Sequence, residues 1–145
     1  MMDRVKRPAN FEHVFKCLKD EENIFSSYKD ILIFAACLAK SRNSKPLQFS
    51  KSSEPIPLHV FNSEYDQVVI YTIAMAHFKT DQGIKLLSDD NINERIKIFE
   101  EYAAAGLSII DQEILKSGNK NIDCLSDFIL LERNPDMLLD QLDKI

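Results

Sequence analysis

The most informative segment of the chain for its architecture is Arg95-Ile96-Lys97-Ile98-Phe99-Glu100-Glu101-Tyr102-Ala103-Ala104-Ala105-Gly106-Leu107. Its first half carries apolar residues at helical spacing, which predicts an amphipathic helix. Its second half is a run of small residues, which lets another backbone approach closely. Gly106 costs about 1 kcal/mol relative to alanine in a helix interior, and either a close helix crossing or a kink would account for it. The stretch therefore predicts packing and carries no chemistry of its own.

Apolar residues recur at helical spacing on both sides of this stretch. Segment 28–41 is apolar nearly all round, as expected of a central buried helix. Segment 64–80 has two apolar faces, which predicts a second core helix. Ser26 or Ser27 is a suitable N-cap for the first of them. We therefore predict an all-α fold, a single compact bundle of five to six helices. The main predicted helices cover residues 10–22, 28–41, 64–80, 91–116 and 121–133.

Residues 42–62 interrupt the helical pattern between the second and third helices. Three prolines in this insertion disfavour helix at and before their own positions. Two short extended pieces, Pro46 to Phe49 and Ile56 to Phe61, could pair as a small hairpin. A loop of this length in a compact domain is either functional or mobile.

The chain divides into three parts. Residues 1–9 are expected to be a flexible basic arm, because they are polar and terminal segments commonly fray. Residues 10–133 are expected to form the helical domain. Residues 134–145 carry leucines on one side and aspartates on the other, which predicts an amphipathic acidic tail. This tail docks either on its own domain or in the groove of a partner.

The composition of the 145-residue chain is typical of one globular domain, with 45% hydrophobic residues and a net charge of −5 at pH 7. Residues 1–52 hold 10 Lys and Arg against 6 Asp and Glu, whereas residues 53–145 hold 8 against 17. An acidic domain is not a general DNA-coating protein, but a local basic face is compatible with it. No signal peptide is evident, and the most apolar run, Ile31 to Ala39, is far shorter than the ~20 residues that span a bilayer. We therefore predict a cytoplasmic protein with no membrane contact.

No pattern of catalytic or metal-binding residues stands out. The histidines form no His-Glu-x-x-His motif, and the chain has no Gly-x-Ser-x-Gly, Walker loop or dinucleotide fingerprint. The three widely spaced cysteines are typical of reduced core thiols. Glu100 and Glu101 point about 100° apart on a helix, so they cannot share a proton, although a glutamate beside Tyr102 could bond to a neighbouring helix. We predict no catalytic residue, no cofactor, no metal and no enzymatic activity.

Two sets of residues are candidates for contacts with partners. The first is a group of cations that spans twelve residues in and before the insertion, and it could hold roughly two or three phosphates. A solvated loop and an acidic protein partner are the alternatives. The second set concerns packing, either within one chain or across the two-fold axis of a homo-oligomer. The first set comprises Lys40, Arg42, Lys45 and Lys51, and the second comprises Glu101, Tyr102, Ala103, Gly106, Leu138 and Leu142.

Four blocks of sequence occur in an order that is typical of one protein family. They are Tyr28-Lys29-Asp30-Ile31-Leu32-Ile33-Phe34-Ala35-Ala36, Pro55-Ile56, Val60-Phe61 and Ile98-Phe99-Glu100-Glu101-Tyr102-Ala103-Ala104-Ala105-Gly106-Leu107. With these blocks the chain resembles the dnd system-associated protein 4 family, small accessory proteins found with bacterial DNA phosphorothioation (dnd) gene clusters. The similarity covers about residues 5–131, and its most specific block is Phe99 to Leu107. The pair Ala104-Ala105 departs from the polar-plus-glycine pair expected there, which predicts a more regular helix.

The resemblance implies a part in phosphorothioate-linked defence against phage and foreign DNA. It supplies no catalytic residue, and it implies that sulfur insertion and DNA cleavage belong to larger partner proteins. The leading hypothesis is therefore a non-enzymatic accessory protein that binds proteins of a DNA modification or restriction complex. The alternative is a DNA-binding or regulatory protein that uses the basic segment 40–51. A hydrolase or nuclease with a site assembled from scattered Asp, Glu and His is a third hypothesis.

Overall fold

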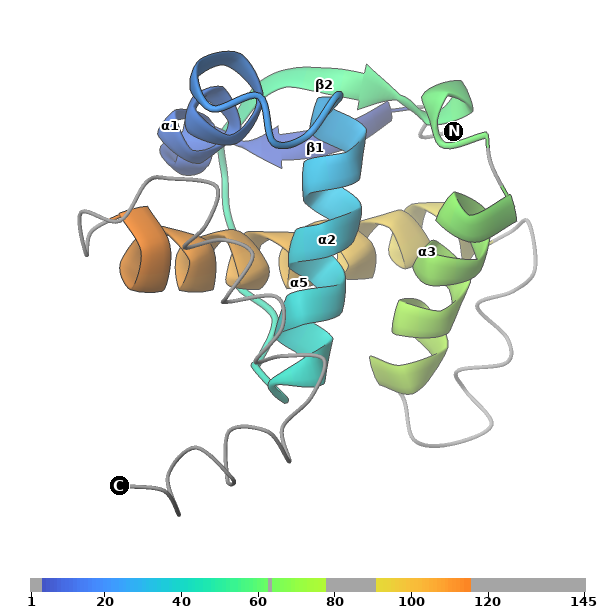
Figure 1. Cartoon of the computed structure of the whole chain (residues 1–145). Helices are drawn as coiled ribbons and strands as arrows, with labels where there is room; N and C mark the ends of the chain where they lie inside the picture. The colour runs from blue at the N-terminus through green and yellow to red at the C-terminus, as the bar shows by residue number, and fades with distance from the viewer. Residues whose placement is uncertain (1–3, 63, 78–90, 116–145) are drawn as a thin grey trace.

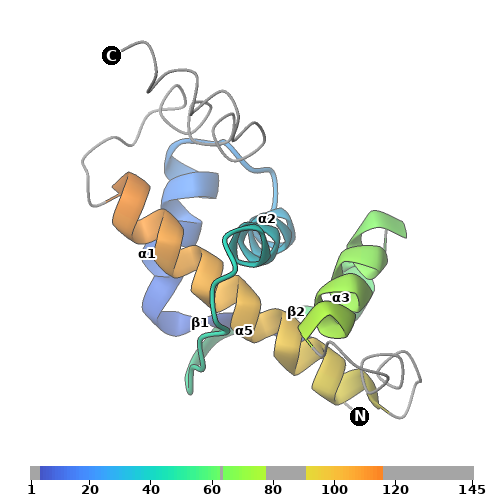
Figure 2. The same cartoon turned by 90° about the horizontal axis from the view of Figure 1, so that it is seen from below.

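Two helices that cross each other form the centre of the fold. The computed structural model describes residues 4–62, 64–77 and 91–115. Helix α2 (Tyr28–Ser41) lies across helix α5 (Ile92–Ile110), and the two run in clearly different directions (Figures 1 and 2). Both helices contribute fully buried apolar side chains to one continuous core. From these two helices the core includes Ile31, Leu32, Ala35, Ala36, Ala39, Ile96, Phe99, Ala103, Leu107 and Ile110.

Gly106 lies where α5 passes closest to α2. A Cβ atom built on Gly106 would be 1.7 Å from the carbonyl oxygen of Ala35, so no larger residue fits without moving a helix. Helix α5 continues through Gly106 without interruption, and Ala103 beside it is completely buried. A close helix crossing therefore explains this glycine, and the small-residue run packs inside the chain.

A local side chain caps the start of α2, and backbone conformation marks the other ends of the two central helices. Ser27 is the N-cap of α2, where its Oγ accepts a hydrogen bond from the Asp30 N–H at 3.3 Å. The helix ends at Ser41, and Asn43 then takes a left-handed conformation with a φ of 55°. Asn91 occupies the N-cap position of α5. Beyond Ile110 the chain continues as a π-helical turn, η5 (Asp111–Leu115).

The segment predicted as one helix over residues 10–22 forms three consecutive helical pieces. They are η1 (Ala9–Phe11), α1 (Glu12–Phe15) and the π-helix η2 (Lys16–Glu21). Their shared apolar stripe is buried, as its helical spacing predicts. The buried residues of this stripe are Phe11, Val14, Phe15 and Leu18.

Helix α3 (Glu64–His77) packs against α5 through one face only. Ile70, Ile73 and Ala74 are buried, whereas Tyr65 and Val68 are 85% and 58% exposed. The helix therefore contributes to the core as predicted, but only one of its two apolar faces is buried. Apolar residues on both faces of a helix show that either face could be buried. In the described part of the fold, residues of the core cover only one face of α3.

A small antiparallel sheet lies along the same side of the central helices as α1 (Figure 1). Strand β1 (Arg4–Pro8) pairs with β2 (Ser52–Pro57), with Arg4 opposite Pro57 and Pro8 opposite Ser52. The predicted hairpin is therefore wrong, because the strand from the insertion pairs with the N-terminal segment. Residues 46–49 form no strand, and η3 (Leu58–Val60) is a 3-10 turn.

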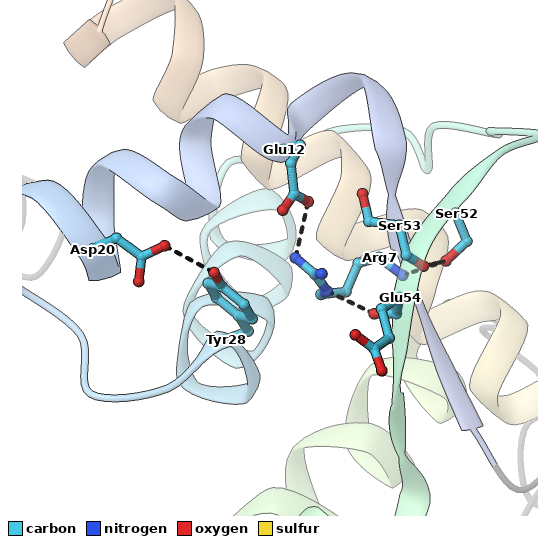
Figure 3. Close-up of polar contacts among 7 residues, drawn as sticks. All are labelled: Arg7, Glu12, Asp20, Tyr28, Ser52, Ser53 and Glu54. Atoms are coloured by element: carbon cyan, nitrogen blue, oxygen red, sulfur yellow. Dashed lines mark hydrogen bonds and ion pairs between the residues drawn. The ribbon is translucent and has the colours of Figure 1, made fainter.

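The prediction of a flexible arm over residues 1–9 is wrong for β1, because this strand is tied down by Arg7 (Figure 3). The Arg7 guanidinium pairs with the Glu12 carboxylate at 2.9 Å and donates through Nε to the Glu54 carbonyl at 2.9 Å. It also lies 4.4 Å from the centre of the Tyr28 ring. A cation that is almost fully buried needs such partners, and here they come from three separate elements.

The architecture therefore departs from an all-α bundle of five to six helices. The described residues are mostly helical, with α1, α2, α3 and α5 as their α-helices, and they include a two-stranded sheet. The helix predicted over residues 121–133 and the predicted tail, 134–145, lie outside the described residues.

Candidate functional site

The structure separates the four cations that were predicted to form one contact surface. Lys40 is half-buried, and its Nζ donates to the Ala76 carbonyl at 3.3 Å and lies 5.0 Å from the centre of the Tyr102 ring. Arg42 pairs with Glu113, with 2.5 Å between Nη1 and Oε2. Lys40 and Arg42 therefore join α2 to the neighbouring helices.

Lys45 and Lys51 are exposed, at the two ends of a segment that we call the strap, residues 45–51. The strap crosses α5 (Figure 2). The backbone N–H of Leu47 donates to the Glu101 carbonyl of α5 at 2.9 Å, and the Lys51 carbonyl accepts from the Ala9 N–H at 2.9 Å. These two bonds hold the strap against the fold although it has no regular secondary structure.

The surface along the strap is hollowed in two places that share Gln48 and Phe49. The larger hollow has a volume of about 750 Å³ and lies between the strap and η1, and the smaller one has about 210 Å³ and lies between the strap, β1 and α5. We call the two together the strap groove. Ala9, Asn10, Gln48, Phe49, Ser50 and Lys51 line the larger hollow, and Lys6, Gln48, Phe49, Lys97, Glu100 and Glu101 line the smaller one.

The strap groove gathers cations that sequence reasoning did not connect. Lys6 comes from β1, Lys51 from the strap and Lys97 from α5, and all three are exposed. Lys6 lies in the segment predicted as a flexible arm, and Lys97 lies in the half of the 95–107 stretch that is predicted as an amphipathic helix. No spacing along the chain relates these residues, so only their tertiary arrangement shows that they share one surface.

Glu100 lines the smaller hollow and is almost completely buried, with 3% of its surface exposed. Its Oε2 accepts a hydrogen bond from the Lys6 backbone N–H at 2.5 Å. Burial raises the pKa of Glu100 to about 7, against the opposing effect of the Lys6 N–H and charge. Of the glutamate pair, Glu100 thus accepts a hydrogen bond from strand β1, where the prediction was a bond from a glutamate beside Tyr102 to a neighbouring helix. This carboxyl group changes its charge near neutral pH.

Three of the four predicted interface residues of α5 face the interior of the chain, and the fourth, Glu101, lines the smaller hollow. Tyr102 is buried, its hydroxyl is 2.9 Å from His77 Nδ1, and burial raises the pKa of the phenol. Ala103 and Gly106 lie in the crossing with α2. Glu101 is half-buried beneath the strap. The remaining two predicted residues, Leu138 and Leu142, lie outside the described residues.

The exposed side of α3 is a second candidate contact surface. Tyr65 and Val68 are one helical turn apart, and both point away from the core. We call them the α3 face. They were assigned to the core from the sequence, since their apolar character alone does not show which side of a helix meets a neighbour.

The described ranges offer few other candidates for chemistry. Within residues 4–62, 64–77 and 91–115, no group of three or more His, Cys, Asp and Glu side chains could hold a metal ion. No helix described in these ranges has the length and apolar character needed to cross a membrane. Cys17 carries a buried thiol and Cys37 an exposed one.

Comparison with known protein families gives a match over nearly the whole chain. Residues 4–144 match the family described as DNA sulphur modification system-associated protein 4. No curated protein and no solved structure matches the chain. The match agrees with the resemblance carried by the four sequence blocks, and its description places the family with DNA sulphur modification systems. The chain belongs to the DNA sulphur modification system-associated protein 4 family.

Proposed function

We propose that this protein is a non-enzymatic accessory protein of a DNA sulphur modification or restriction system that defends against foreign DNA. In this proposal it acts by binding another protein of the same system. Membership of the family supports the proposed link to a DNA sulphur modification system. The exposed α3 face is the observation that supports the mode of action.

The α3 face has the properties of a protein contact surface. Tyr65 offers a large ring with a polar end, and tyrosine is enriched where proteins bind one another. Val68 extends the apolar area by one helical turn. The opposite side of α3 is anchored in the core by Ile70 and Ile73, so the face is presented on a rigid support. Such a face is well suited to the centre of an interface.

The test is an affinity pull-down of the tagged full chain from its native host, at low and high salt and with nuclease treatment in parallel. We expect a stoichiometric protein that survives both treatments and that mass spectrometry identifies as a component of the DNA sulphur modification system. The double variant Tyr65→Ser/Val68→Ser should lose this protein. Leu47→Ser is the matched control, because it also replaces an exposed apolar side chain but lies on the strap.

Two results would contradict the proposal in different ways. If the unchanged protein recovers no component of the system, the accessory role is wrong. If the double variant recovers as much partner as the control, the role stands but the α3 face is not the contact surface. Cleavage of DNA by the purified protein with Mg²⁺, Mn²⁺ or Zn²⁺ would overturn the non-enzymatic part.

The strap groove supports a second candidate function, DNA binding in a regulatory role. Lys6 and Lys97 add two exposed cations to the predicted basic segment, whereas Lys40 and Arg42 are engaged within the chain. Affinity for DNA should then fall linearly on a log–log plot against salt, by about 0.9 in slope for each phosphate contact with B-form DNA. Replacing Lys45 and Lys51 by glutamine should reduce this slope, and Lys16→Gln, at another exposed lysine, should leave it unchanged.

A further inference from the structure

We infer that the strap groove binds single-stranded nucleic acid, with one unstacked base lying on Phe49 in the smaller hollow and the flanking phosphates on Lys6, Lys51 and Lys97. This inference deepens the second candidate function, since it names the kind of nucleic acid and the way it is held. It does not depend on the protein partner proposed for the α3 face.

Phe49 is placed to stack on a base. It is half-buried and lines both hollows, so part of its ring faces the groove. Within residues 4–62, 64–77 and 91–115, no other aromatic ring packs against it. Stacking of a base on an aromatic ring tolerates any sequence, because every base has a flat face.

Glu100 supplies an acceptor that lacks a donor in the described part of the fold. Only its Oε2 is bonded, to the Lys6 N–H, and Oε1 has no hydrogen-bond donor among the described residues. Oε1 is not sealed in the core but reaches the surface of the smaller hollow, where a solvent molecule or a ligand can donate to it. The N–H groups on the edge of a base could donate to Oε1, and the Gln48 amide lines the same hollow.

The position of Glu100 favours a single strand over a duplex. In a duplex the N–H groups on the Watson–Crick edge are already paired and the bases are stacked on one another. A base can reach a buried carboxyl group beside Phe49 only after it leaves the stack. Three exposed lysines around the two hollows can then hold the flanking backbone.

The experiment measures binding of the full chain to a fluorescent DNA 12-mer by anisotropy, as a single strand and as a duplex. We expect the single strand to bind at least about tenfold more tightly. Phe49→Leu should weaken single-strand binding about tenfold, the effect of losing one base stack. Tyr65→Leu is the matched control, because it removes an exposed ring on α3 and should leave the affinity unchanged.

A second arm tests the carboxyl group through pH. The charged and titratable side chains that line the smaller hollow with Glu100 are Lys6, Lys97 and Glu101. Because the pKa of Glu100 is raised to about 7, its carboxylate form increases as the pH rises through neutrality. Single-strand affinity should therefore increase between pH 6 and pH 8, and Glu100→Gln should remove that increase while it keeps an acceptor for the Lys6 N–H.

Several results would overturn the inference. Equal binding of duplex and single strand, or an unchanged affinity in a folded Phe49→Leu variant, would show that the groove does not hold an unstacked base. Equally tight binding of poly-glutamate would show that the lysines recognise an acidic protein instead. Failure to bind any DNA would reject both the inference and the second candidate function, while the pull-down tests the α3 face separately.

Discussion

The substitution Gly106→Ala tests the central helix crossing directly. The added Cβ would lie 1.7 Å from the Ala35 carbonyl oxygen, 2.3 Å from its carbonyl carbon and 2.7 Å from its Cα. All three are backbone atoms of α2, so no side chain can rotate away to make room. The two helices would have to move apart, which would disturb the packing of neighbours such as Ala103 and Leu107.

The magnitude follows from two opposing effects. Overpacking of a well-packed core lowers the free energy of unfolding by about 1–3 kcal/mol. Because the added atom would meet backbone atoms, we expect a cost at or above the upper end of this range. Alanine in place of glycine favours the helix by about 1 kcal/mol. We therefore expect the free energy of unfolding to fall by about 2 kcal/mol. For a chain of this length, that corresponds to a fall in Tm of roughly 8 °C.

The assay is urea unfolding followed by circular dichroism at 222 nm, on the unchanged protein and the variant. Lys97→Ala is the control, because it changes an exposed residue of the same helix. The double variant Ala35→Gly/Gly106→Ala should not recover stability, since the clash involves the backbone of Ala35 and not its Cβ. If Gly106→Ala is as stable as the unchanged protein or more stable, the reasoning about the crossing is refuted.

Three further predictions concern stability, each measured by urea unfolding. Glu100 has a folded pKa of about 7 against an ordinary value of 4.5, so its protonated form stabilises the fold and this contribution is lost as the pH rises through 7. Between pH 5 and pH 8 the unchanged protein should lose roughly 2–3 kcal/mol more than Glu100→Gln, and equal losses would contradict the assigned burial. Arg7→Met should cost about 2–3 kcal/mol and speed hydrogen exchange in β1, because the Glu12 carboxylate and the Glu54 carbonyl lose their donor; unchanged exchange would argue against the Arg7 contacts. Ser27→Ala should lower the free energy of unfolding by about 1 kcal/mol through loss of the α2 N-cap. If Ser26→Ala costs more than Ser27→Ala, Ser27 is not the cap.

The helical spacing of apolar residues was enough to predict α2, the apolar stripe of residues 11–18 and the main length of α5. A cap at Ser26 or Ser27 and a special role for Gly106 were also predictable, because each depends on the chemistry of one residue and its near neighbours, whereas the structure was needed to choose Ser27 as the cap and a crossing over a kink. The family followed from short blocks of sequence, and the family comparison confirms it.

The strand at Arg4–Pro8 could not be predicted in the same way. It contains one buried aliphatic side chain, Val5, between charged residues, so it resembles a solvated arm. The burial of Arg7 depends on partners from α1, α2 and β2 that lie far apart in the sequence. A buried charge is stable only where such partners meet, and their meeting is a property of the tertiary structure.

The candidate surfaces show the same division. Which residues can share a face of a helix was predictable from the order of the amino acids alone, because it depends on a fixed helical repeat. The packing of α3 in the folded chain was needed to show that the core covers one side of this helix and leaves Tyr65 and Val68 exposed. Only the tertiary structure brought Lys6 and Lys97 together beside the strap. Periodicity is a local property of the backbone, whereas a surface is defined by the elements that pack beside it and by those that do not.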